Sequence, residues 1–357
     1  MTGSPRSVTT QAPTVTGAGT GQPQRIRVAQ SADIVSNITL HPCLTWRAKP
    51  LTNDEIFETL RLALELGCNY WNGGDFYGPP DNNSLTVLKK YYEKYPEDVN
   101  RVLLNVKGCS RLPDFKIDAS PEGVHKSIEA DRAMLGDKGF IDQFESARKD
   151  PEVEIEVSMR AMAAFVRNGK IGGVALSEVS AETIRKAAAV TKIEAVEIEL
   201  SLWATEPLTN GVVEACAELD IPIVAYAPLG RGALTGAIKS LDDIPEGDFR
   251  RTLPRFQPEN WHLNLKLIDA IGALAAKKNC TAAQIAINWV VALNKRPGMP
   301  RIIPIPGASS PERLRENATV VDLAEEDMAE IERILASFPV AGDRYHKHGM
   351  ALLDTSS

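Results

Sequence analysis

Short apolar runs alternate with longer, helically patterned stretches from about residue 33 onward. Eight of the short runs are rich in bulky residues and are bounded by turn-forming residues, which predicts strands. These runs cover residues 34–40, 69–73, 102–107, 140–146, 172–176, 195–199, 221–226 and 301–305. The helical patterns between them cover residues 53–66, 84–94, 122–135, 151–168, 181–190, 210–219, 263–278 and 282–293.

This order predicts an α/β fold, a single (β/α)8 TIM barrel, because there are eight strands and nearly every one is followed by a helix. A doubly wound sheet shows the same alternation, but it binds dinucleotides through a glycine-rich turn after a strand. The run Gly17-Ala18-Gly19 has Gln22 where the third glycine would fall, and no predicted strand precedes it. The missing fingerprint therefore favours the barrel.

The chain divides into a tail and one domain. Residues 1–30 are rich in Ser, Thr, Gly and Pro and contain no acidic residue, which predicts a disordered tail before a barrel of residues 31–357. A transit peptide would also be free of acids, but this stretch lacks an amphipathic pattern. Residues 227–261 form a long connection typical of a functional lid or a disordered loop. The segment from Ala341, with Arg344 and Tyr345, either crosses the barrel mouth or is a solvated terminus.

Composition narrows the functional class. Hydrophobic residues make up 43% and charged residues 24% of the chain, as in an ordinary globular protein. A net charge of −7 argues against a general nucleic-acid binder, and no apolar run is long enough to cross a membrane. Five dispersed cysteines form no CxxC pair, which argues against zinc and a disulfide framework and favours the cytoplasm. The oligomeric state is left open.

Polar side chains follow the predicted strands where a barrel enzyme keeps its chemistry. They include Thr45, Trp46, Asn72, Asp75, Tyr77, Lys107, Glu145, Arg148, Ser177, Glu178, Glu197, Glu199 and Tyr226. Tyr77 and Lys107 end adjacent strands, so an ammonium could lower the phenol's pKa from its usual value of ~10. The plainer alternatives are a packing tyrosine in a strand-to-helix turn and a surface lysine.

A second candidate site follows the last strand. Residues 306–310 combine glycine with small hydroxyl side chains ahead of a helix, and Arg313 adds a planar fork of donors. Free backbone N–H groups and such a fork suit a phosphate. The alternative is a plain helix cap at Ser309 or Ser310, and both roles can coexist.

Seven motifs in order carry a resemblance to a known family. They are Leu-Thr-Trp-Arg (44–47), Trp-Asn-Gly-Gly-Asp-Phe-Tyr-Gly (71–78), Asn-Val-Lys-Gly (105–108), Ile-Asp-Gln-Phe-Glu-Ser-Ala-Arg (141–148), Leu-Ser-Glu-Val-Ser (176–180), Ala-Tyr-Ala-Pro-Leu-Gly-Arg-Gly (225–232) and Ile-Pro-Gly-Ala-Ser-Ser-Pro-Glu-Arg (305–313). With them the chain resembles the aldo-keto reductases, and within that family the fungal pyridoxal reductase-like members, over residues 36–354.

The resemblance implies NADPH-dependent reduction of a small aldehyde or ketone, with a pyridoxal-like substrate. Tyr77 would give a proton to the carbonyl oxygen and Lys107 would tune Tyr77. Tyr226 would stack on the nicotinamide. The carboxamide would be held by Ser177, Glu178 and Glu197, and the 2′-phosphate by Ser309 and Arg313. The other cofactor-binding positions that the resemblance implies are Thr45, Trp46, Leu229, Gly230, Arg231, Gly232, Gly307, Glu316 and Asn317.

Two departures from the family pattern fall in the catalytic set. Asn72 replaces the usual Asp, and Ala147 replaces the usual His, beside Arg148. We therefore place Asn72 and Arg148 with Tyr77 and Lys107 in the candidate catalytic set. Without the Asp, the pKa of Lys107 is expected to be lower than in the usual site, with Asp75 a candidate for the missing charge.

Alternative functions remain beside this one. The atypical first strand, with His41-Pro42-Cys43, is compatible with a reductase specific for one ketone of secondary metabolism. The two departures are compatible with an NADPH-binding protein of little turnover. A metal-dependent or sugar-phosphate barrel enzyme is disfavoured, because the sequence has no cluster of His and carboxylate ligands.

Overall fold

The computed structural model describes residues 38–39, 51–111, 115–308 and 310–354. The predicted tail lies outside these residues, as do three predicted cofactor positions, Thr45, Trp46 and Ser309.

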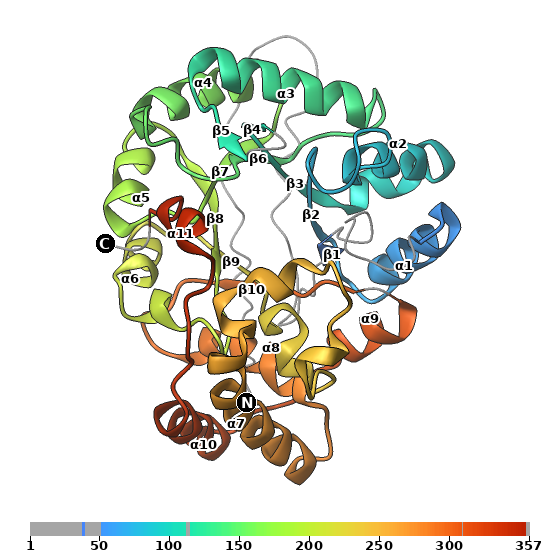
Figure 1. Cartoon of the computed structure of the whole chain (residues 1–357). Helices are drawn as coiled ribbons and strands as arrows, with labels where there is room; N and C mark the ends of the chain where they lie inside the picture. The colour runs from blue at the N-terminus through green and yellow to red at the C-terminus, as the bar shows by residue number, and fades with distance from the viewer. Residues whose placement is uncertain (1–37, 40–50, 112–114, 309, 355–357) are drawn as a thin grey trace, which may run out of the picture.

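Eight parallel strands form the centre of the molecule in the order β1-β2-β3-β6-β7-β8-β9-β10. Their bounds are β1 Ile38–Thr39, β2 Tyr70–Gly74, β3 Leu103–Gly108, β6 Gln143–Ser146, β7 Gly173–Ser177, β8 Ile193–Glu199, β9 Ile223–Tyr226 and β10 Ile302–Ile305. Each overlaps a predicted strand, and Figure 1 shows the helices arranged around the outside of the strands. The predicted (β/α)8 barrel is confirmed. A short antiparallel pair, β4 (Ser110–Arg111) and β5 (Lys116–Ile117), was not predicted.

Helices α1 to α8 fall where the apolar periodicity predicted them, within a few residues, and α9 is the helix expected after the last strand. They are α1 Asn53–Glu65, α2 Ser84–Lys94, α3 Pro121–Leu135, α4 Ile155–Arg167, α5 Ala181–Ala188, α6 Val212–Glu218, α7 Pro258–Lys277, α8 Ala282–Ala292 and α9 Pro311–Asn317. Hydroxyl or amide side chains at Thr52, Asn83, Ser120, Ser180 and Thr281 cap five of them. These caps satisfy backbone N–H groups that a helix start leaves without partners.

Two helices near the C-terminus were not among the predicted elements. They are α10 (Glu325–Ser337) and α11 (Lys347–Ala351). The connection of residues 227–261 contains four 3-10 turns and runs into the start of α7. These turns are η4 Gly230–Thr235, η5 Leu241–Asp243, η6 Phe249–Thr252 and η7 Pro254–Phe256. Further 3-10 turns elsewhere are η2 Pro96–Arg101, η3 Glu206–Leu208 and η8 Leu293–Lys295.

Side chains alternate along each barrel strand between the barrel interior and the side that packs against the helices. Successive side chains of a strand point to opposite sides, so every second residue faces the barrel interior. A small apolar cluster collects Tyr70, Leu103, Ala175, Ala195, Val224, Ile303 and Ile305, whereas the intervening Trp71, Leu104, Phe144 and Val196 join the large core with the helices. Two residues further along several of these strands, the inner face turns polar. The site is therefore built on rigid strands directly above an apolar floor.

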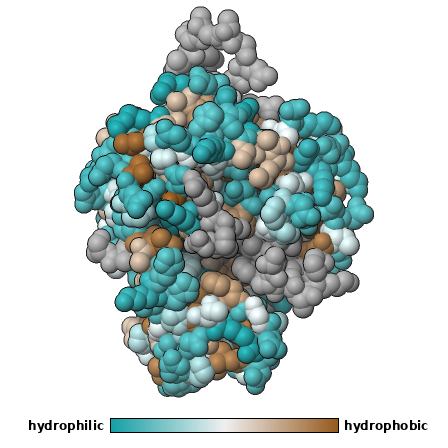
Figure 2. Space-filling model, turned by 45° about the horizontal axis from the view of Figure 1, so that its top comes forward, coloured by the Kyte–Doolittle hydropathy of each residue, from teal (hydrophilic) through white to brown (hydrophobic). Residues whose placement is uncertain are grey.

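The described surface is largely hydrophilic. Figure 2 shows hydrophilic residues predominating over the described part of one face. Large exposed apolar side chains occur at Leu66, Leu219, Phe249, Leu263 and Val320, which are far apart in the chain. No helix among the described residues is long and apolar enough to cross a bilayer.

Candidate active site

Tyr77 stands in a tight turn between β2 and α2. Its backbone N–H donates to the Gly74 carbonyl at 3.2 Å, and its carbonyl accepts from the Ser84 N–H at 3.0 Å. The Ser84 hydroxyl donates to the Gly74 carbonyl at 2.8 Å and accepts from the Gly74 N–H at 2.9 Å. The first residue of α2 thus fixes the turn that presents the phenol, and Phe76 packs edge-on against the Tyr77 ring at 4.7 Å.

The glycine at position 74 is required by the neighbouring strand. A Cβ there would lie 2.9 Å from the Lys107 carbonyl, closer than side chains tolerate. Gly74 and Lys107 are direct partners in the β2–β3 register. The glycine lets the two strands approach just where the phenol and the ammonium leave them.

Lys107 lies between two glutamates. Its Nζ is 2.7 Å from Glu145 Oε1 on β6 and 2.5 Å from Glu197 Oε1 on β8. The three side chains expose 5%, 0% and 2% of their surfaces. The group therefore holds one positive and two potential negative charges out of contact with bulk water.

Asn72 joins this group through Glu197. Its Nδ2 donates to Glu197 Oε2 at 2.6 Å and to Asn105 Oδ1 at 3.0 Å. Asn105 in turn donates to Gln143 Oε1, which also accepts from the Tyr70 hydroxyl. An uncharged amide at position 72 can donate to the carboxylate, whereas an ionised aspartate there would only repel it.

A lower pKa of Lys107 than in the usual family site stays a prediction, and two glutamates set the pKa in this chain. Burial lowers the pKa of Lys107, but the carboxylates of Glu145 and Glu197 outweigh burial and raise it above its ordinary value. Asp75 is not the substitute charge: burial raises its pKa to about 6, and it interacts with Asp131 on α3 instead. The charge that Asn72 does not supply comes from β6 and β8.

The predicted lowering of the Tyr77 pKa by Lys107 is outweighed by the effect of burial. Burial raises the pKa of Tyr77 to about 12, while the charge of Lys107 acts in the predicted direction and that of Arg148 assists it. Glu197 and Glu145 push the pKa upward. Tyr77 consequently keeps its proton at neutral pH, which is the form a proton donor requires.

Arg148 brings a second cation to the phenol. It follows β6, and its Nη atoms donate to the Ala147 carbonyl at 2.6 Å and to the hydroxyls of Ser177 and Tyr345, both at 3.4 Å. No carboxylate of the described residues lies within 4 Å of its guanidinium. Its charge therefore acts on the Glu178 carboxylate at longer range and not through a direct ion pair.

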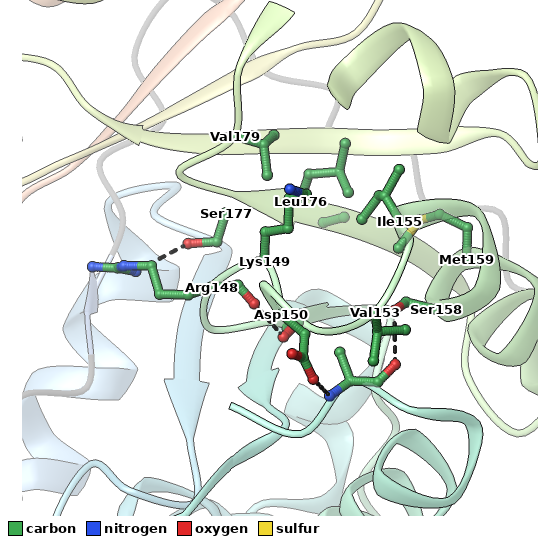
Figure 3. A pocket seen from close by; sticks show the side chains of 13 residues that line it. Arg148, Lys149, Asp150, Val153, Ile155, Ser158, Met159, Leu176, Ser177 and Val179 are labelled. Carbon is green, nitrogen blue, oxygen red and sulfur yellow. Dashed lines mark hydrogen bonds between the residues drawn. The ribbon is translucent and has the colours of Figure 1, made fainter. Parts of the chain in front are cut away.

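A small cavity lies beside this arginine, between β6, β7 and the start of α4. Its wall is mostly apolar, with Ile155, Met159, Leu176 and Val179. Figure 3 shows the Arg148 guanidinium pointing away from these side chains, past the Ser177 hydroxyl. The cavity is thus a gap in the packing behind the candidate site. The Arg148 guanidinium points out of it, toward Ser177 and Tyr345.

The predicted nicotinamide residues gather at the ends of β7, β8 and β9. Glu178 follows Ser177 with a left-handed backbone (φ +52°), and its N–H donates to the Glu197 carbonyl at 2.9 Å. Ala227 and Arg231, after β9, are also left-handed. Such conformations cost free energy in non-glycine residues and cluster at functional sites. Gly230 and Gly232 also have positive φ in the loop after β9. Leu229 directly precedes them, at the start of η4.

The C-terminal segment lies across these residues. Arg344 donates to both oxygens of Glu178 at 3.0 Å and lies 3.4 Å from Glu199 Oε2. The Tyr345 hydroxyl is 3.1 Å from that of Tyr226, and the Arg231 guanidinium stacks 4.4 Å from the Tyr345 ring centre. Of the two alternatives for this segment, the one that crosses the barrel mouth is confirmed.

The far end of the segment is fixed to α5. Asp354 accepts hydrogen bonds from the Ser180 N–H at 3.0 Å and from the Thr183 hydroxyl at 2.6 Å. Lys149 approaches it at 3.3 Å. In Figure 1, α11 accordingly lies beside α5 and β8.

The candidate phosphate site is a separate group at the start of α9. The Ser310 side chain caps the helix, accepting from the Arg313 N–H at 3.3 Å, so one of the two predicted capping hydroxyls acts as a cap. The Arg313 side chain is 51% exposed and contacts Glu316 at 3.1 Å. Asn317 donates to the Gly307 carbonyl at 3.3 Å and holds the loop to the helix.

Residues 43–336 match the Aldo/keto reductase family. The chain belongs to that family. It is 38% identical over 312 residues to "Probable pyridoxal reductase 2" of Schizosaccharomyces pombe, a match that covers 85% of this chain and 92% of the relative. It is 37% identical to the aldo-keto reductase yakc of the same yeast, named with NADP(+), over 79% of this chain and 83% of the relative.

A solved structure shares the fold of this aldo-keto reductase. A glycerol dehydrogenase from Gluconobacter oxydans superposes with a TM-score of 0.73, covering 86% of this chain and 93% of the other. The sequences are 21% identical, so this likeness concerns the barrel alone.

Sequence reasoning gave no role to several residues that the structure brings to the site of this aldo-keto reductase. Glu145 was placed at a strand end, but nothing in its spacing showed that its carboxylate meets Lys107. The β3–β6 register decides this, because it pairs Lys107 with Glu145 directly. Tyr345 and Arg344 were recognised only as members of a tail. Their aromatic and cationic character in a C-terminal segment was the available indication.

Proposed function

We propose that this protein is an NADPH-dependent reductase of small carbonyl compounds, with pyridoxal or a similar aldehyde as substrate. The observation that carries the proposal is the placement of Tyr77 and Lys107. They leave adjacent barrel strands within electrostatic reach of each other, and Tyr77 is protonated at neutral pH. A positioned acid of this kind accelerates proton transfer to a reacting oxygen.

In the proposed reaction, Tyr77 holds the carbonyl oxygen by a hydrogen bond and gives it a proton as negative charge develops there. Bound NADPH supplies the hydride to the carbonyl carbon. Lys107 stabilises the phenolate that Tyr77 becomes, because its ammonium lies in the same buried group. Glu145 and Glu197 keep Lys107 charged and fix its position.

Arg148 takes over the role of a fixed positive charge near the oxygen. Its guanidinium has no ion pair among the described carboxylates, and its charge lowers the pKa of Tyr77. A cation aimed at developing negative charge favours the transition state over the neutral carbonyl. We infer that Arg148 compensates for the absent histidine at position 147.

The residues at the mouth suit a nicotinamide dinucleotide. Tyr226 ends β9 with an aromatic face, Ser177 ends β7 with a hydroxyl, and both lie beside the catalytic group. Glu178 would act through its main chain, since its carboxylate is held by Arg344. Arg313, exposed and with only a surface partner, suits the 2′-phosphate, which favours NADPH over NADH.

The names of similar proteins support the substrate class. A probable pyridoxal reductase of fission yeast matches over nearly its whole length, and another relative is named with NADP(+). Among the described residues no group of three or more His, Cys, Asp or Glu could hold a metal ion. Acid catalysis by Tyr77 is the chemistry that the residues of this site support.

The test is NADPH oxidation with a panel of aldehydes and ketones, including pyridoxal, by wild type and by Tyr77→Phe. Removing the proton donor is expected to lower kcat by ~10²- to 10⁴-fold with little change in cofactor binding. Tyr95→Phe also removes a single phenolic hydroxyl, but at the end of α2 and away from the catalytic group, so it is the matched control and should keep the wild-type rates. Equal rates for wild type and Tyr77→Phe on every substrate would rule out the catalytic assignment.

A second candidate is an NADPH-binding protein with little turnover. Asn72 and Ala147, in place of the usual acid and histidine, are the observations that favour it. Tight binding of NADPH without reduction of any carbonyl in the panel would support it. Tyr77 and Lys107, which binding alone would not require, favour the enzyme.

A further inference from the structure

The polar group around Lys107 contains one carboxyl more than a single ammonium neutralises. Glu145 and Glu197 approach the same Nζ from two different strands, at 2.7 and 2.5 Å. With both carboxylates ionised, the group carries a net charge of −1 in a part of the barrel that is almost fully buried. Two carboxyl groups that share a buried site do not readily ionise together.

We propose that Glu145 and Glu197 share one proton beside Lys107 at neutral pH, and that Glu145 thereby acts as a positioning residue that controls the acidity of Tyr77. This inference rests on the proposed function only where it concerns the rate of reduction. The proton itself is a property of the protein without substrate or cofactor.

The groups that face Glu145 come from each neighbouring strand. Lys107 on β3 and Glu197 on β8 are in contact with it, and Tyr70 on β2 and Tyr77 lie within its electrostatic reach. β7, the other neighbour of β6, carries no ionisable side chain between Gly173 and Ser177. Lys107 is thus the only cation in direct contact among the described residues.

Asymmetry within the pair favours Glu145 as the holder of the proton. Glu197 accepts a hydrogen bond from Asn72 at 2.6 Å on the oxygen that does not face Lys107, whereas Asn72 makes no such bond to Glu145. An amide donor stabilises the ionised form of the carboxylate that accepts it. Burial, followed by the opposing effects of Lys107 and Glu197, raises the pKa of Glu145 to about 8.

Loss of this proton would change Tyr77. The charge of Glu145 raises the pKa of Tyr77, so ionisation of Glu145 makes the phenol a weaker acid. Reduction should then slow by ~3- to 10-fold as pH rises through the titration of Glu145, well before Tyr77 itself ionises. The arrangement gives the reductase an alkaline limit set by a residue that never touches the substrate.

The first experiment compares kcat for aldehyde reduction between pH 6 and 10 in wild type, Glu145→Gln and Asp131→Asn. We expect a fall near pH 8 in wild type and in Asp131→Asn, which removes a different buried acid on α3, and no such fall in Glu145→Gln. The same fall in Glu145→Gln, or none in wild type, overturns the control by Glu145.

The second experiment uses infrared absorption of the protein without cofactor. A carboxylic acid C=O band should disappear from wild type between pH 7 and 9, and this component should be missing from Glu145→Gln. In Glu197→Gln, which removes the repelling neighbour, the band should already be lost at lower pH. Identical spectra for the three proteins overturn the shared proton, and this outcome is independent of whether any carbonyl is reduced.

Discussion

Asn72 donates a hydrogen bond of 2.6 Å to the same glutamate, Glu197, that approaches the Lys107 ammonium at 2.5 Å. The amide therefore belongs to the charged group without adding charge to it. The acid that the family pattern places on β2 has its counterpart on β8, and Asn72 is the neutral donor that this arrangement requires.

Asn72→Asp should therefore harm the protein although it restores the usual family residue. The new carboxyl would face Glu197 at hydrogen-bond distance, so the pair must either repel as two anions or take up a proton, and this should cost about 2–4 kcal/mol of unfolding free energy at pH 8. Urea unfolding monitored by fluorescence measures this. Adding Glu197→Gln should restore a donor–acceptor pair and most of the stability. A double variant as unstable as the single one would show that repulsion is not the cause.

The fold was predictable from sequence because its determinants are local. The alternation of short apolar runs with helical stretches indicated eight strands, and capping residues such as Ser120 and Thr281 marked the helix starts. The placement of Tyr77 beside Lys107 was predictable in part, since each ends a strand and adjacent strands bring their ends together.

The electrostatics of the site was not predictable, because it depends on pairs distant in the chain. Lys107 meets Glu197 across the barrel interior, far away in sequence, so the carboxylates that raise the pKa of Lys107 could not be identified from Asn72 alone. Arg344 and Glu178 likewise come into contact because the C-terminal segment folds back over the barrel, and no local sequence pattern indicates this contact.

Arg148→Gln should slow reduction while leaving the fold intact. Loss of a cation near the developing oxygen charge should reduce kcat by about 10²-fold, with a smaller change in KM. Arg148→Lys keeps the charge but not the planar fork of donors. Its kcat should lie between those of wild type and Arg148→Gln. Steady-state kinetics with pyridoxal distinguishes these cases. A kcat unchanged in Arg148→Gln would remove the arginine from the catalytic set.

Arg344→Ala should destabilise the C-terminal segment and the barrel mouth. Burial raises the pKa of Glu178, but Arg344 and Arg148 outweigh burial and lower it to about 2, so the variant would leave an ionised, buried carboxylate without its bidentate partner. The expected loss is about 3 kcal/mol in urea unfolding at pH 7. Arg185→Ala removes an exposed ion pair with Glu218, which solvent screens, and should leave stability almost unchanged. Equal effects of the two substitutions would contradict the prediction.

Arg313→Ala should weaken the binding of NADPH far more than the binding of NADH. Loss of a charged hydrogen bond to the 2′-phosphate corresponds to about 1.5–3 kcal/mol, or ~10- to 100-fold in Kd. Fluorescence titration of both cofactors measures the ratio of their Kd values. Arg315→Ala, on the same helix and also exposed, is the matched control and should leave that ratio unchanged. Equal losses for the two cofactors in Arg313→Ala would exclude the 2′-phosphate role.

Asp131→Asn should change the pH dependence of stability. Burial, and then the charge of Asp75, raises the pKa of Asp131, and burial raises that of Asp75 to about 6. A carboxyl whose pKa is raised by folding binds more protons in the folded state, so the unfolding free energy decreases as pH rises from about 4 through these pKa values. Removing Asp131, whose Oδ1 has no hydrogen-bond partner among the described residues, should lessen that decrease. Thermal unfolding at pH 5 and pH 8 tests this: the variant should gain stability relative to wild type at pH 8, and a constant difference between the two pH values would show that Asp131 is ionised throughout.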